Sequence, residues 1–185
     1  MTTQYFTATS LDGYVADENN SLDWLMEADS DSTGDSSFGD FFAHVGAIAM
    51  GATTYLWQLE HERLVEEPAK WQLYYGDTPS WVFTHRTLPV VPGARIAFVQ
   101  GDVAPVHARM KEAAGDKNIW LAGGGELVGQ FCDQGLLDEI FLTVAAVTLG
   151  RGAPLLPRRL TSSALELVDV ARDRQFAKLR YRVRR

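Results

Sequence analysis

The sequence predicts a single α/β domain, residues 1–185, built on a mostly parallel sheet that ends in an antiparallel hairpin. Over the first two thirds of the chain, short apolar runs of strand length alternate with stretches whose apolar residues recur at helical spacing. Alternation of this kind favours parallel strand–helix–strand units. The C-terminal part instead holds two strand-like segments, Leu165 to Ala171 and Phe176 to Val183, with a turn near Arg172 to Arg174. Two strands joined so closely pair antiparallel.

The first strand leads into a long polar connection. Gln4 to Thr9 is rich in strand-forming residues, and the Asp12-Gly13 pair marks a turn after it. Asp17 to Ser37 is polar and acidic apart from Leu22 to Met26, and it is either an ordered lid or a disordered surface insertion. A short amphipathic helix follows, with an apolar face made of Phe38, Phe41, Phe42 and Val45.

Two glycine junctions, each joining a buried strand to a helix, organise the middle of the chain. Ala47 to Gly51 is the first strand of this kind, and a helix begins after it at Thr53 or Thr54. Ile119 to Ala122 is the second, followed by Gly123 to Gly125 and by apolar residues at helical spacing. The free N–H groups and the dipole of such a helix start favour an anion such as a phosphate. A plain strand-to-helix turn is the alternative at either junction.

Three further strands and one helix complete the expected order. Trp81 to Thr84 and Arg95 to Val99 have strand composition, and Val106 to Ala114 has helical spacing. The acidic connection before Trp81 is expected to be irregular. Asp138 to Thr148 is a long strand that leads into a glycine-rich stretch.

Composition and charge are those of an ordinary globular protein. Hydrophobic residues make up 46% of the chain, and the net charge of −7 argues against a general nucleic-acid or anionic-membrane binder. No apolar run reaches the roughly 18 residues that span a membrane, and the N-terminal stretch lacks the regions of a signal peptide. We therefore expect a cytoplasmic protein. Cys132 is the only cysteine and the histidines lack metal-ligand spacing, so we expect no disulfide and no metal.

Four stretches that follow one another along nearly the whole chain carry a family resemblance. They are SLDGYVA with LDWL (Ser10 to Ala16, Leu22 to Leu25), MGATTY (Met50 to Tyr55), FTHR (Phe83 to Arg86), and IWLAGGGELVGQF with DEIFLTVAAVTLGRGAPLLP (Ile119 to Pro157). Together they resemble the C-terminal reductase domain of the bifunctional riboflavin-biosynthesis deaminase-reductase and its stand-alone bacterial relatives. The resemblance implies a dihydrofolate-reductase-like fold, with a mostly parallel mixed sheet, an antiparallel C-terminal hairpin and helices on both faces.

The resemblance also implies an NADPH-dependent reductase whose cofactor lies across the ends of the parallel strands. Ligands of open α/β sheets bind at that edge on physical grounds too. Ala52 stands where relatives often carry Arg, so NADH is a possible cofactor as well. In this fold the Gly123–Gly124 bond is characteristically cis. The cofactor-binding residues implied are Gly51, Ala52, Thr53, Thr54, Thr84, His85, Arg86, Gly123, Gly124, Gly125, Glu126 and Leu127.

Candidates for catalysis and substrate binding rest on fewer observations. Asp12 follows the first strand, toward the expected nicotinamide end, and Asp35 has roughly the spacing to Gly51 of the pterin-contacting carboxylate of dihydrofolate reductase. The alternatives are a turn residue for Asp12 and a helix-start carboxylate for Asp35. Trp24 is either a wall or lid of the substrate pocket or a core anchor for the loop. Arg151 is a candidate for holding a substrate phosphate.

Three function classes compete. The first is an NAD(P)H-dependent reductase of a small heterocyclic or carbonyl substrate, similar to 5-amino-6-ribosylaminopyrimidine-phosphate reductase. The second is a nucleotide-binding module of the same fold without turnover. The third is a flavin-binding or other non-nicotinamide α/β protein. Because relatives of this type commonly form homodimers, we expect one here, with the Asp138 to Thr148 strand contributing to the interface.

Overall fold

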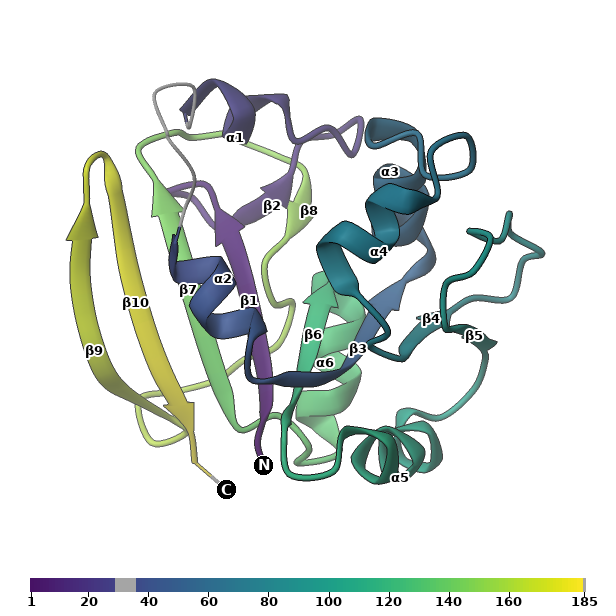
Figure 1. Ribbon diagram of the computed structural model, residues 1–185. Coiled ribbons are helices and arrows are strands. Elements are labelled where there is room, and N and C mark those ends of the chain that lie inside the picture. Colours follow the sequence, from purple (N-terminus) through teal and green to yellow (C-terminus); the bar gives the residue numbers. More distant parts are fainter. Residues whose placement is uncertain (29–35, 185) are drawn as a thin grey trace.

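The computed structural model describes residues 1–28 and 36–184, and a large mixed sheet runs through its centre (Figure 1). Its strands are β1 (Thr3–Thr9), β3 (Val45–Gly51), β4 (Ser80–Phe83), β5 (Ile96–Val99), β6 (Asn118–Gly123), β7 (Glu139–Ala145), β9 (Leu165–Asp173) and β10 (Phe176–Val183). They are arranged in the order β5-β4-β3-β6-β1-β7-β10-β9. Two short strands, β2 (Tyr14–Ala16) and β8 (Ala153–Pro154), pair with each other beside this sheet.

The pairing of the strands confirms the sheet expected from the sequence. Neighbouring strands from β5 to β7 are parallel. The last two strands form the antiparallel hairpin, in which β10 pairs with β7 on one side and with β9 on the other. The carboxyl ends of β1, β3, β4, β6 and β7 therefore meet at one edge of the sheet.

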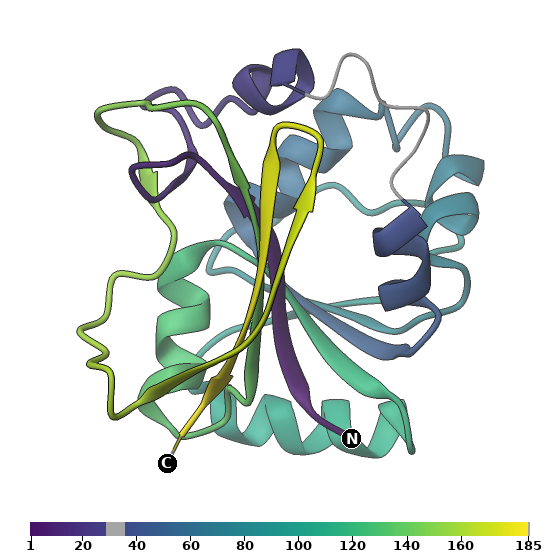
Figure 2. The same cartoon turned by 90° about the vertical axis from the view of Figure 1, so that its left-hand side faces the viewer.

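Helices lie on both faces of the sheet, as expected. They are α1 (Asp23–Ala28), α2 (Ser36–Phe42), α3 (Ala52–His61), α4 (Ala69–Tyr75), α5 (Val103–Ala114) and α6 (Gly125–Asp133). When the molecule is turned to bring the hairpin to the front, α2 lies on one side of the sheet and α6 on the other (Figure 2). Among residues 1–28 and 36–184, no helix has both the length and the apolar composition needed to cross a membrane.

The central strands bury both of their faces. Ile48 and Met50 of β3 face a core shared with α3 and α4, whereas Ala47 and Ala49 face a second core shared with α5 and α6. In β6, Trp120 faces the first of these cores and its two neighbours face the second. Side chains alternate between the faces of a strand. Burial on both sides explains why these strands are continuous apolar runs in the sequence.

Several expectations about the elements were inexact. Val45, expected on the apolar face of α2, begins β3 instead, and α3 begins at Ala52 rather than at Thr53 or Thr54. Two of the helices, α1 and α4, lie in segments expected to be loop; α4 buries Trp71 and Tyr75, one helical turn apart, inside an otherwise polar stretch. The helix α5 begins at Val103, because Asp102 accepts a hydrogen bond from the N–H of Ala104 and caps the helix. The strand β7 ends at Ala145, earlier than expected. Of the connection from Asp17 to Ser37, residues 17–28 are ordered around α1 and residues 29–35 lie outside the described residues.

We expect the two-sided burial of β6 to dominate stability. Leu121→Ala should lower the free energy of unfolding by about 2 to 5 kcal/mol, because the side chain is 0% exposed and its removal leaves a cavity. Leu73→Ala is the matched control, since Leu73 is 79% exposed on α4; it should change stability by less than about 0.5 kcal/mol. Urea denaturation measures both. Equal effects of the two substitutions would contradict this account of the core.

Candidate active site

A cavity of about 490 Å³ lies at the edge where the parallel strands end. Both glycine junctions line it. They follow β3 and β6, which are neighbours in the sheet (Figure 1). Nine of the twelve expected cofactor-binding residues line it together, although they are far apart in the sequence. They are Gly51, Ala52, Thr53, Thr54, Gly123, Gly124, Gly125, Glu126 and Leu127.

Both helices that start at this cavity have uncapped N-termini. Gly51 is the N-cap of α3 and Gly124 is the N-cap of α6, and neither position supplies a side-chain hydrogen bond to the first turn. The peptide bond between Gly123 and Gly124 is cis, as the resemblance implied. The two junctions are close together, because a Cβ added to Gly51 would lie 3.7 Å from the backbone nitrogen of Gly124. Two sets of free N–H donors thus converge on one space, an arrangement that suits an anion.

Much of the cavity wall comes from residues that the sequence analysis left out of the site. Trp57 of α3 lines it, stacked on His61 with ring centroids 4.5 Å apart. Trp57 follows Thr53 by one helical turn, so its place on the same face of the helix is a signal that helical spacing offered. The other lining residues that were missed are Tyr5, Thr7, Val15, Ala16, Asn20, Leu22, Ala122, Ala153, Pro154 and Pro157.

One wall is a strap, residues 153–158, that passes directly over the start of α6. A Cβ at Gly125 would lie 2.3 Å from the carbonyl oxygen of Pro154, so only glycine allows this approach. The hydroxyl of Tyr5 donates a hydrogen bond of 3.1 Å to the carbonyl of Leu155 and anchors the strap from the sheet. Burial raises the pKa of Tyr5 above its ordinary value, so this hydroxyl remains a donor at neutral pH.

The side chains around the cavity supply almost no charge. Among the described residues that line it, Glu126 is the single charged one. Ala52, in the first turn of α3, offers no cation. An anionic ligand in this space would therefore be held by backbone N–H groups and by the hydroxyls of Thr53 and Thr54.

The remaining expected cofactor-binding residues, Thr84 to Arg86, lie at the same edge of the sheet but outside the cavity wall. They follow β4, whose last residue pairs with Gly51. The N–H of Arg86 donates to the hydroxyl oxygen of Thr84 at 2.9 Å, which closes a tight turn. His85 and Arg86 are exposed beyond that turn. Their contact with a cofactor stays a prediction.

Of the two catalytic candidates, Asp12 holds two loops together. Its carboxylate accepts hydrogen bonds from the Ser10 hydroxyl at 2.6 Å and from the N–H groups of Leu149 and Gly150 at 3.1 and 2.7 Å. The Ser10 hydroxyl, followed by the two backbone donors, lowers the pKa of Asp12 below its ordinary value. A carboxylate held in the ionised form is a poor proton donor. Asp12 does not line the cavity. The other candidate, Asp35, lies outside the described residues. A catalytic role for either residue stays a prediction.

The two substrate-binding candidates also lie apart from the cavity wall. Trp24 is buried with Ala145 and Phe176 in a small cluster under α1, which agrees with a core anchor. Arg151 is exposed and forms an ion pair with Glu18, with 2.9 Å between its Nε and the carboxylate. That pair joins the loop after β2 to the loop before β8. Substrate binding by Trp24 or Arg151 therefore stays a prediction.

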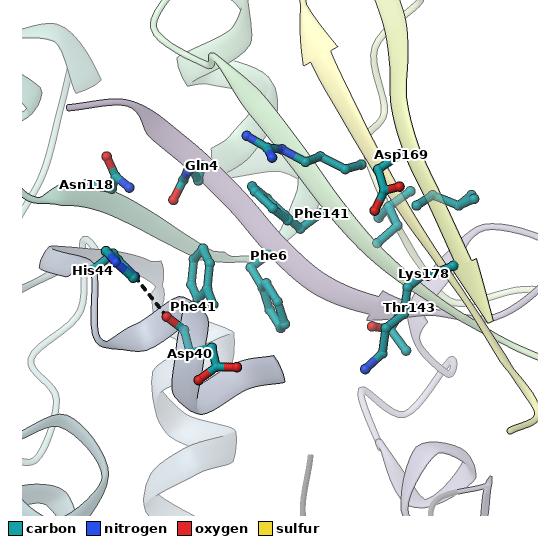
Figure 3. A pocket seen from close by; sticks show the side chains of 14 residues that line it. Gln4, Phe6, Asp40, Phe41, His44, Asn118, Phe141, Thr143, Asp169 and Lys178 are labelled. Atoms are coloured by element: carbon teal, nitrogen blue, oxygen red, sulfur yellow. Dashed lines mark hydrogen bonds between the residues drawn. The ribbon is translucent and has the colours of Figure 1, made fainter. Parts of the chain in front are cut away.

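A second cavity, of about 460 Å³, opens on the face of the sheet between α2 and the hairpin (Figure 3). The rings of Phe6, Phe41 and Phe141 line it, with Asp169 and Lys178 on the hairpin side. Neither glycine junction lines this second cavity, and neither do the first turns of α3 and α6 that follow the junctions. The cavity at the strand ends is therefore the candidate active site.

Comparison with known proteins identifies the family. Residues 2–177 match the model of the RibD C-terminal domain. The chain belongs to the RibD C-terminal domain family. Within the family it is 32% identical over 186 residues to YwjB of Bacillus subtilis strain 168, a protein of uncharacterised function; the match covers 97% of this chain and 96% of YwjB.

Solved structures agree on the fold. A candidate riboflavin biosynthesis protein from Shewanella sp. PV-4 superimposes with a TM-score of 0.79 at 24% identity, over 100% of both chains. The deaminase/reductase of Thermotoga maritima superimposes with a TM-score of 0.67 at 16% identity, over 98% of this chain and 56% of that one. Dihydrofolate reductase from Enterococcus faecalis, solved with NADP(H), gives 0.59 at 13% identity, over 98% and 96%. The dihydrofolate-reductase-like fold expected from the sequence is thus confirmed.

We expect Asp12 to act as a loop clamp. Because its folded-state pKa is lowered, its contribution is present above the ordinary pKa of an aspartate and is lost as pH falls through the folded value. Asp12→Ala should therefore lower the protection factors of the Leu149 and Gly150 amides at pH 7, and acidification through the folded-state pKa, below the ordinary aspartate value, should lower them in the wild type. NMR hydrogen exchange measures both. Asp17→Ala, which affects only its own turn, is the control; unchanged exchange in Asp12→Ala would refute the clamp.

Proposed function

We propose that this protein is an NADPH-dependent reductase, with NADH as a possible alternative cofactor, that reduces a small heterocyclic or carbonyl substrate. The observation that carries the proposal is the convergence of two uncapped helix N-termini on one cavity. A dinucleotide has two linked phosphates that such an arrangement can hold. Membership of a reductase domain family and the likeness to a dihydrofolate reductase solved with NADP(H) support the same cofactor class.

The described residues fit a bound dinucleotide. The cavity volume of about 490 Å³ lies within the usual range for small-molecule sites. A Cβ added at Gly124 would meet no atom within 4 Å, so the backbone there borders open space in which a ligand can approach it closely. The nicotinamide would supply the hydride, and the protein would bind, orient and exclude water. In this scheme the first turns of α3 and α6 hold phosphates, with the Thr53 and Thr54 hydroxyls as added donors.

For the substrate we propose a class rather than a compound. The Thermotoga maritima relative is named for reduction of a phosphoribosylaminouracil, and a similar aminopyrimidine is our candidate. Trp57 and Leu22 offer an apolar wall, and Asn20 beside them offers an amide for hydrogen bonds. A planar polar heterocycle suits such a wall, since its ring can stack while its edge hydrogen-bonds.

One observation favours the alternative, a nucleotide-binding module without turnover. Reduction of most heterocycles needs a proton as well as a hydride. Among the described residues that line the cavity, Glu126 is the only carboxyl group, and its two oxygens are bonded to Arg158. In the reductase proposal the proton therefore comes from ordered water or from a group beyond this wall.

Titration with NADPH and NADH, followed by tryptophan fluorescence, tests the cofactor. Trp57 lines the cavity and should report binding. We expect saturable NADPH binding, weakened by Gly124→Val because the new side chain fills cavity space. Arg86→Ala should weaken NADPH by roughly tenfold and leave NADH unchanged, because the guanidinium would contact only the 2′-phosphate. Arg109→Ala, on α5, is the charge-matched control.

The outcomes separate the competing functions. Absence of binding by either dinucleotide would overturn the reductase proposal. Tight binding with no oxidation of NADPH across a panel of aminopyrimidines and carbonyl compounds would favour the module without turnover. A yellow chromophore that co-purifies with the protein would favour a flavin.

We also propose that the protein pairs as a homodimer through the face that contains the second cavity (Figure 3). On this face Lys178 and Arg180 of β10 lie beside Asp169 of the exposed edge strand β9. A second copy related by a two-fold axis would place these opposite charges across the interface.

Light scattering after size exclusion tests the homodimer. We expect a dimer mass for the wild type. Asp169→Lys should shift the mass toward the monomer, because it removes the acidic partner from the face. Asp116→Lys, which makes the same charge change in the exposed turn before β6, should leave the dimer intact. A wild-type monomer at tens of micromolar protein would refute the pairing.

A further inference from the structure

Arg158, at the end of the strap, forms three hydrogen bonds with two carboxylates of α6. Its two terminal nitrogens pair with the two oxygens of Glu126 at 2.8 and 3.0 Å. Its Nε donates to Asp133 at 2.7 Å. These carboxylates lie near the two ends of the helix, about two turns apart. The guanidinium thus lies between these two carboxylates, against the middle of α6.

The sequence of α6 leaves room for the side chain of Arg158. A Cβ added to Gly129, midway between the two carboxylates, would lie 2.7 Å from the Cζ of Arg158. The absence of a side chain there lets the guanidinium lie flat against the helix backbone. The side chain of Arg158 is only 23% exposed, in contrast to the neighbouring Arg159, which is exposed. A planar bidentate contact of this kind is stronger than an ordinary surface ion pair.

The position of Glu126 makes this contact relevant to the cavity. Glu126 is in the first turn of α6 and is the single charged side chain among the described lining residues. An unpaired carboxylate there would repel a phosphate approaching the same helix start and would weaken the favourable dipole. Arg158 neutralises this carboxylate and also holds it toward the strap side of the helix.

We propose that Arg158 is a positioning residue for the dinucleotide: by pairing with Glu126, it frees the N-terminus of α6 to accept a phosphate. This inference rests on the proposed cofactor class. The competing explanation is mechanical, because the strap carries Pro154 and Pro157 in the cavity wall and Arg158 attaches the strap to α6. The two explanations differ in what happens when Glu126 loses its charge.

The test compares dissociation constants for NADPH in four variants by tryptophan fluorescence. Arg158→Gln should raise the dissociation constant by roughly tenfold, because it exposes a negative charge beside the phosphate site. Arg158→Gln combined with Glu126→Gln should return it to within about threefold of wild type, since the repelling charge is gone. Glu126→Gln alone should bind as tightly as wild type or more tightly. Arg159→Gln, with the same change of net charge one residue away, should have no effect.

Other results would contradict either the role of Arg158 or the proposed function. A double variant that binds as weakly as Arg158→Gln would overturn the inference in favour of the mechanical role. An unchanged constant in Arg158→Gln would overturn both explanations. If Arg158→Gln fails to fold by circular dichroism, the double variant decides alone, because near-wild-type binding is expected only when Arg158 acts through the charge of Glu126. Failure of the wild type to bind NADPH or NADH overturns the proposed function instead.

Discussion

Burial of the central strands on both faces is the constraint on which the rest of this structure depends. Ile48 and Met50 face one core, and Ala47 and Ala49 face the other. Where both faces of a parallel sheet are covered, the ends of its strands stay open to solvent, and ligand sites of open α/β sheets form at that edge. The chain leaves the sheet there through Gly51 and through the glycines after β6, which places two helix starts against one another.

In the proposed function, the affinity of this site for anions comes from the backbone. Ala52 supplies no cation, and Glu126, the one charged side chain among the described lining residues, is an anion paired by Arg158. Donors fixed by a helix need no reorganisation when a ligand arrives, whereas flexible lysine or arginine side chains lose entropy on binding. The same design makes the site sensitive to any nearby unpaired carboxylate, because few positive charges are available to compensate for it.

Local contacts between loops hold the walls of the site. Asp12 joins the turn after β1 to Leu149 and Gly150, and Arg151, in the same loop as those two residues, pairs with Glu18 in the loop after β2. Polar loop residues such as Asp12 and Arg151 are natural functional candidates in a sequence. In this structure their side chains bond mainly to other residues of the protein. Their bonds attach the segments on either side of β2 to the loop that leads into β8.

The sequence by itself determined the fold class, the order of the main strands and the two glycine junctions, because periodicity and glycine act through local backbone preferences. It also led, through family resemblance, to the cis bond at Gly123–Gly124. The sequence did not predict the short helix α4, because only the tertiary burial of Trp71 and Tyr75 stabilises so short a segment. Only the tertiary structure decided that Trp24 and Arg151 do not line the cavity, and that Arg158 pairs with Glu126. These outcomes depend on which distant segments pack together, and no local pattern encodes that choice.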